Sequence, residues 1–198
     1  MLADMAYKHN DYEVATEAYG SLIDITGNPS TKLNAQVHRL RAAQMVGNHT
    51  LIIKETATVL ANGKLLPETA TELRYYRAKA YLAQGKSDMA IEDLRTLAKD
   101  TRNVYGAEAK YLLAQLYYDI RQYDNAEKEV IDYISVSTPH SYWLARSFVL
   151  LADVYMKSDK YIEAKQYLVS LKQSYQAKDD IASMIESRLE TLDKLMNK

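Results

Sequence analysis

The residues of this sequence whose types could do chemistry are few and lie far apart. The four histidines, His9, His38, His49 and His140, have no partner at the three- or four-residue spacing that places two metal ligands on one helix face. The chain has no cysteine, so thiol catalysis, disulfides and cysteine-ligated zinc are excluded. It also lacks an HExxH sequence, a glycine-rich phosphate loop and a nucleophile elbow. We therefore expect no enzyme, no catalytic residue, no metal site and no cofactor.

Two charged clusters are the nearest approach to a chemical site. Asp119, Asp124 and Glu127 lie close together, but on a helix–turn–helix such a cluster is more typical of a solvated surface. Segment 74–77, Arg-Tyr-Tyr-Arg, has the mixture of rings and cations that stacks on bases and binds phosphates. The charge balance argues against that role, because 25 Lys and Arg face 26 Asp and Glu, for a net charge of −1. We expect no nucleic-acid partner.

The sequence also contains no pattern for a membrane. No run of about 18 apolar residues occurs, so we expect no direct membrane insertion. Residues 1–8 lack a charged leader followed by an apolar stretch, and they do not predict a signal peptide.

The elements that must position any site follow from a repeated pattern. A small residue is followed by a Tyr three positions later, an Ala nine residues after the Tyr, and an apolar residue four further on. Copies begin at Ala78, Ala114 and Ala152, a spacing of 36 to 38 residues. Self-similarity at this period predicts a solenoid of stacked units.

Glycine and proline mark the ends of these units. Four of the six Gly and all three Pro sit at predicted breaks, and between them apolar residues recur three and four positions apart, which predicts helices and no sheet. Asn103 and Thr138 precede two of these helices as candidate N-caps, and Pro139 is expected as a first helical residue. The fold class is therefore all-α, a single solenoid over 1–198. Five helix pairs are expected at about 1–27, 30–62, 67–100, 103–136 and 138–175, followed by a capping helix at 179–196.

The pattern resembles the tetratricopeptide repeat, or TPR. The fifth unit carries the fullest set, with Ala152, Tyr155, Ala164 and Leu168 in the family's slots, and the second unit departs most. The resemblance implies a right-handed superhelix that binds protein partners, and the chain is most similar to the C-terminal part of long bacterial envelope TPR proteins. Because the first unit begins after its first turns, we expect a fragment of a longer chain. The resemblance slightly favours periplasm or cell envelope over cytoplasm.

By the same resemblance, the first helix of each pair lines a concave surface that holds a peptide. Tyr and Arg side chains in the centre of such a surface are typical of binding hot spots. The alternative is that the tyrosines pack on neighbouring helices and close the groove. The candidate peptide-binding residues are Arg41, Tyr75, Lys79, Tyr111, Gln115, Tyr118, Val149 and Asp153.

These observations favour a non-enzymatic scaffold that binds a peptide or helix of a partner protein. Two alternatives remain open at this point. The chain is the sensor half of a larger regulator, or it is a structural spacer or oligomerisation module that self-associates through its exposed first repeat.

Overall fold

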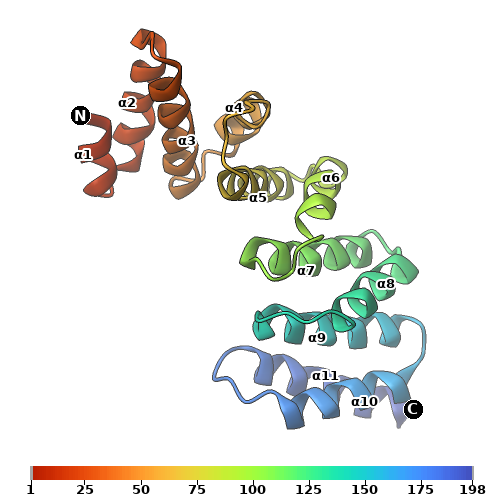
Figure 1. Ribbon diagram of the computed structural model, residues 1–198. Coiled ribbons are helices and arrows are strands. Elements are labelled where there is room, and N and C mark those ends of the chain that lie inside the picture. The colour runs from red at the N-terminus through yellow and green to blue at the C-terminus, as the bar shows by residue number, and fades with distance from the viewer. Residues whose placement is uncertain (1, 198) are drawn as a thin grey trace. The chain divides into compact units, whose positions relative to one another are not determined.

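The computed structural model describes residues 2–197 and is built from helices alone over that range (Figure 1). The eleven described helices are α1 (Leu2–Lys8), α2 (Tyr12–Ile25), α3 (Pro29–Met45), α4 (His49–Leu60), α5 (Pro67–Ala83), α6 (Ser87–Leu97), α7 (Val104–Asp119), α8 (Tyr123–Ile134), α9 (Ser141–Lys157), α10 (Tyr161–Ser174) and α11 (Ile181–Met196). The predicted all-α class is confirmed. Across the described residues, no helix combines the length and hydropathy that a membrane crossing requires.

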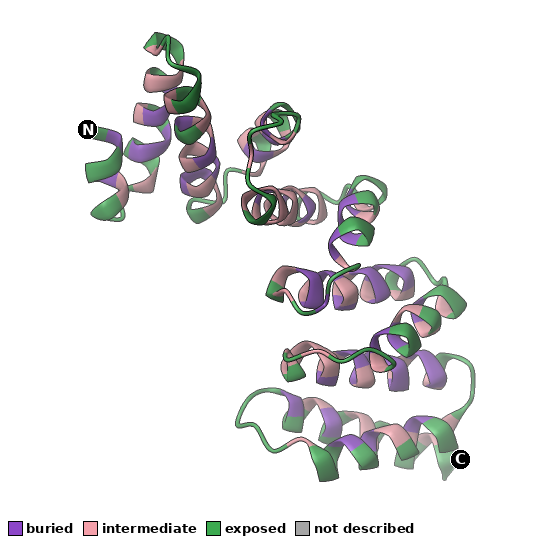
Figure 2. Ribbon diagram, in the orientation of Figure 1, coloured by how far each residue is buried: buried purple, intermediate pink, exposed green. Residues whose placement is uncertain are grey.

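The chain falls into two compact units, which are described separately. Unit 1 comprises residues 1–93 and unit 2 comprises residues 94–198, with the boundary inside α6. A single continuous solenoid over 1–198 stays a prediction. Within both units the buried residues lie on the faces that neighbouring helices turn toward each other, and the exposed residues lie on loops and outer faces (Figure 2).

One turn recurs in all five helix pairs. It contains a residue in the left-handed region, with φ from 57° to 68°. The next residue donates its backbone N–H to the carbonyl five positions earlier, the longer bond of a Schellman motif. Those carbonyls belong to the slot that the sequence pattern fills with Tyr. The left-handed residues are Asn10, Gly47, Gly85, Arg121 and Asp159, and the accepting carbonyls are those of Ala6, Ala43, Tyr81, Tyr117 and Tyr155.

Helix starts are set by short polar side chains and by proline. Asn103 caps α7 as expected, since its side chain accepts a hydrogen bond from the backbone N–H of Tyr105 at 2.8 Å. The expected start at Pro139 is wrong, because α9 begins at Ser141. The Thr138 hydroxyl donates instead to the carbonyl of Thr101, 2.8 Å away, and this bond anchors the loop rather than capping a helix.

The core of unit 2 follows the repeat pattern. Ala114 and Ala126 are fully buried in α7 and α8, and the small side chains allow the two backbones to approach closely. Tyr155 of α9 lies in the core, and its hydroxyl donates to Glu127 Oε1 of α8 at 3.0 Å. The Tyr of this repeat therefore links its helix pair to the preceding helix pair. Burial of the ring, and after it this hydrogen bond, raise the pKa of Tyr155.

The core of unit 1 contains a half-buried histidine. His38 of α3 stacks on the ring of Tyr19, with centroids 5.5 Å apart, and meets Tyr7 edge-on. Burial and the nearby Arg41 guanidinium lower the pKa of His38, while the carboxylates of Asp4 and Glu72 oppose that shift.

Candidate functional site

The structure divides the candidate peptide-binding residues between the two units. Unit 1 contains Arg41, Tyr75 and Lys79, and unit 2 contains Tyr111, Gln115, Tyr118, Val149 and Asp153. We describe the two sets in turn.

In unit 1, Arg41 is bound to a neighbouring helix. Its Nη2 lies 2.7 Å from Glu72 Oε2, and its Nε donates to Oε1 of the same carboxylate at 3.0 Å. The Tyr76 hydroxyl also donates to Glu72, at 2.7 Å. The ion pair links α3 to α5 and raises the pKa of Arg41. Arg41 nevertheless lines a small cavity of about 320 Å³ together with His38 and the apolar side chain of Val37.

Tyr75 and Lys79 form a second, partly exposed pair on α5. The Lys79 ammonium lies 5.9 Å from the centre of the Tyr75 ring, at the limit of a cation–π contact. Both side chains are intermediate in exposure. They are accessible, but neither lines the cavity beside Arg41.

In unit 2, three of the candidate residues line one cavity. Gln115 and Tyr118 of α7 and Asp153 of α9 contribute to a cavity of about 690 Å³, which we call the unit 2 groove. Its floor and walls are mixed in character, because Met156 adds an apolar side chain and Lys157 a charged one. Burial and the negative charge of Asp153 raise the pKa of Tyr118. The phenol is therefore neutral over the physiological range.

The far wall of the unit 2 groove is α11. This helix presents Ser187, Arg188, Thr191 and Leu195 to the cavity. Arg188 donates to Asp153 from two nitrogens, with Nη2 3.0 Å from Oδ2 and Nε 3.2 Å from Oδ1. The pair joins α9 and α11 across the groove.

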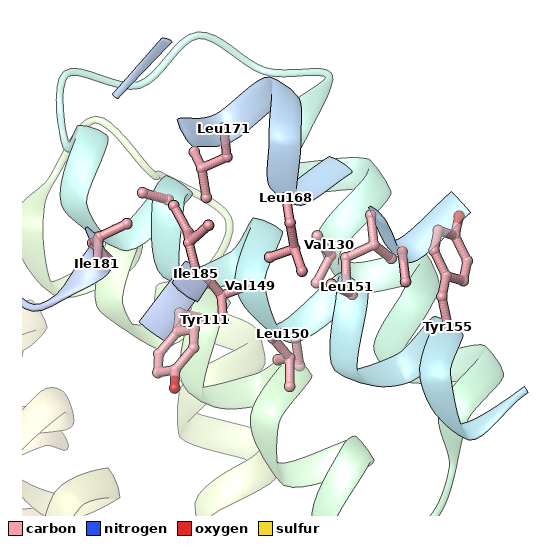
Figure 3. Close-up of a cluster of buried hydrophobic side chains, with 14 of the residues drawn as sticks. Tyr111, Val130, Val149, Leu150, Leu151, Tyr155, Leu168, Leu171, Ile181 and Ile185 are labelled. Atoms are coloured by element: carbon pink, nitrogen blue, oxygen red, sulfur yellow. The ribbon is translucent and has the colours of Figure 1, made fainter. Parts of the chain in front are cut away.

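Val149 of α9 is buried and does not line the unit 2 groove. It is 1% exposed and belongs to the buried cluster that also contains Ile185 and Leu192 of α11 (Figure 3). By the resemblance to the repeat family, Val149 occupies a position of the first helix of its pair that faces an open concave surface. In this chain α11 packs against α9 and its apolar side chains cover that position.

Tyr111 is buried as well, at 7% exposure, and it supports the groove rather than lining it. Its hydroxyl donates to Gln115 Oε1 at 3.0 Å, while Gln115 Nε2 donates to Asp119 at 2.9 Å. The Arg146 guanidinium lies 5.0 Å from the Tyr111 ring centre and donates to its hydroxyl. For Tyr111 the packing alternative therefore describes the structure better than direct contact with a ligand.

The sequence analysis did not place Arg188 beside the candidate residues, because it treated α11 only as a cap. A signal was present, since Asp153 and Arg188 are opposite charges 35 residues apart, close to the repeat spacing. Among the residues that the structure describes, no group of three or more His, Asp or Glu side chains is placed to hold a metal ion.

Comparisons with known proteins define the class. One tetratricopeptide-repeat family model matches residues 75–141 and a second matches residues 145–178, and together they cover about half of the chain. The chain belongs to the tetratricopeptide-repeat proteins. A comparison with curated protein sequences finds no significant match.

Solved structures show the same fold. A crystal structure titled MamA has a TM-score of 0.67 at 18% identity, with 98% of each chain covered. A second, titled MamA protein, has a TM-score of 0.68 at 19% identity and covers 90% of this chain and 93% of that one. A putative kinesin light chain with nearly identical TPR-like repeats, from Podosopora anserina, has a TM-score of 0.61 at 20% identity, covering 87% and 90%. At these identities the likeness shows the fold alone.

Proposed function

We propose that this chain is a protein-interaction scaffold and that the unit 2 groove binds a peptide segment of a partner protein. The observation that carries the proposal is the groove itself, a cavity of about 690 Å³ that brings together Gln115, Tyr118 and Asp153. A volume of this size accommodates several side chains of an extended segment.

The lining has the composition of a binding surface. The ring of Tyr118 and the flexible side chain of Met156 supply apolar area, and Met adapts its shape to different partners. Gln115 and Thr191 supply donors and acceptors that can pair with a peptide backbone. A mixture of apolar area and placed polar groups gives affinity and orientation together.

The test uses a phage-displayed library of random peptides of about 12 residues, selected on the whole chain. Peptides that are enriched are synthesised with a fluorescent label and titrated by anisotropy. Met156→Ala removes apolar area from the groove without changing its charge and is expected to weaken binding by about tenfold, because a peptide can no longer bury its own apolar surface against that side chain. Ile131→Ala is the control, since it removes an exposed apolar side chain of α8 outside the groove. Equal binding by wild type and Met156→Ala contradicts the proposal.

A second candidate function is self-association through the first repeat. Leu2 and Met5 of α1 are 69% and 60% exposed, a large apolar exposure for a short helix. Light scattering over a range of concentrations measures the mass directly. A mass that rises in wild type and stays monomeric in a Leu2→Ser/Met5→Ser variant supports this role, and a constant monomer mass in wild type removes it.

A further inference from the structure

The unit 2 groove contains a guanidinium that is fixed on one edge and free on the other. Asp153 holds Arg188 through Nε and Nη2. Within residues 2–197, no protein group accepts a hydrogen bond from Nη1 of Arg188, which also lines the cavity. The side chains of Arg188 and Asp153 are 29% and 18% exposed, so the pair is partly shielded from solvent. A guanidinium held in this way presents its remaining donors in one orientation.

Apolar side chains attach α11 to unit 2 independently of the ion pair. The helix is held by Ile181, Ile185 and Leu192, which are between 0% and 2% exposed in the core of unit 2. Partly exposed ion pairs add little stability of their own. An arginine that is oriented but not required for packing is suited to contact a ligand.

Among the side chains that line the groove, cations outnumber carboxylates by two to one, while Asp119 lies just outside the lining and accepts a hydrogen bond from Gln115. Arg188 and Lys157 face a single lining carboxylate, Asp153, which is already engaged by Arg188. Lys157, the last residue of α9, is exposed, and none of the ion pairs among the described residues includes it. The groove therefore offers one oriented and one exposed cation to an anionic group.

Apolar side chains lie beside these cations. Tyr118, Met156 and Leu195 line the same cavity, so a ligand that pairs with Arg188 also meets an apolar surface. A small free anion bound to Arg188 would leave this apolar surface exposed to water. A peptide with an acidic side chain can cover the surface with the apolar side chain of a neighbouring residue.

We propose that the unit 2 groove recognises a peptide segment in which an acidic side chain stands beside an aliphatic one. Arg188 Nη1 donates to the carboxylate, Lys157 attracts it, and Asp153 is the positioning residue that aims Arg188. This inference rests on the proposed function, because it names the chemistry of the segment that the same groove binds.

The experiment uses the peptides selected on the whole chain, synthesised in pairs that differ only by Glu→Gln or Asp→Asn. Each pair is titrated by fluorescence anisotropy against wild type, Arg188→Gln and Lys157→Gln. A hydrogen bond to a charged group is worth about tenfold or more in affinity, so the acidic member is expected to bind wild type at least tenfold more tightly. Arg188→Gln is expected to remove that preference, and Lys157→Gln to reduce it and to lessen its salt dependence. Lys165→Gln is the matched control, because it breaks the exposed Lys165–Asp193 pair outside the groove.

The possible outcomes separate the two proposals. If peptides bind in a Met156-dependent way and the amide partners bind as tightly as the acids, acidic recognition is wrong while the groove remains the binding site. If Met156→Ala leaves all binding unchanged, the proposed function fails and the acidic preference fails with it. If circular dichroism shows that Arg188→Gln does not fold, acidic recognition is tested by the Lys157→Gln titrations and by the comparison of acid and amide peptides on wild type.

Discussion

Gly106 gives the sharpest test of the packing in unit 2. A Cβ added to Gly106 would lie 2.1 Å from the carbonyl oxygen of Asp100 and 2.7 Å from that of Leu97. Both neighbours are backbone atoms, and the Asp100 carbonyl is itself bonded to the N–H of Asn103 at 3.3 Å. Because Cβ atoms do not approach oxygen to less than about 3 Å, α7 or the preceding loop must move by about 1 Å to admit a methyl group.

Two effects of Gly106→Ala oppose each other. Ala is favoured over Gly in a helix interior by up to about 1 kcal/mol. Overpacking costs about 1–3 kcal/mol and more when the backbone must shift, so the steric term wins. We expect a net loss of about 2 kcal/mol, which for a chain of this length lowers the unfolding temperature by about 4–8 °C.

Gly20 of α2 is the matched control. There the added Cβ meets the guanidinium of Arg39 at 3.1 Å, and this is the end of a flexible, partly exposed side chain. Gly20→Ala should therefore be neutral or stabilising by up to about 1 kcal/mol. Thermal and urea unfolding followed by circular dichroism measure both variants. A Gly106→Ala protein as stable as wild type would refute the close approach of α7 to the loop before it.

Three further predictions concern single residues. Arg121 has a φ of 62°, a backbone conformation that costs an L-residue free energy and a glycine none. Arg121→Gly should therefore increase the free energy of unfolding by about 0.5–1 kcal/mol, net of the greater entropy of glycine in the unfolded chain, and raise the urea midpoint. Tyr155→Phe removes the hydrogen bond to Glu127 and should cost about 1–2 kcal/mol in thermal unfolding. The pKa of His38 is lowered in the folded chain, so unfolding takes up a proton, and stability should fall as the pH drops below about 6.5. A His38→Gln variant should lose that part of the pH dependence, and a titration of the imidazole by NMR that gives an ordinary pKa would contradict it.

Much of the fold was predictable because its determinants are local. In two of the five turns the left-handed residue is a glycine, Gly47 or Gly85, and in every turn the carbonyl that closes it belongs to the position where Tyr recurs. In the first pair the same turn forms with Asn10, although Ala6 replaces the Tyr. Backbone hydrogen bonding sets this geometry, so it survives changes in the side chain that marks it.

The candidate site was less predictable because exposure depends on a neighbour distant in sequence. Val149 and Asp153 lie one helical turn apart on α9. Judged by their positions in the repeat alone, both side chains are expected on the exposed concave surface. Whether each is covered depends on how α11 packs on α9. Val149 is covered by apolar side chains of α11, whereas Asp153 meets Arg188 of the same helix and stays at the edge of the groove.

The two faces of α11 explain how one helix both closes a core and forms a wall. Ile185 and Leu192 are seven residues apart and share a buried stripe, while Arg188 and Leu195, each three residues later, line the groove. At 3.6 residues per turn, a shift of three residues rotates a side chain by about 60° from the first stripe. Deleting α11 would therefore remove core and binding surface together. Substitutions confined to the groove stripe separate the two, because Ile185 and Leu192 keep the helix in place while the contacts to a ligand change.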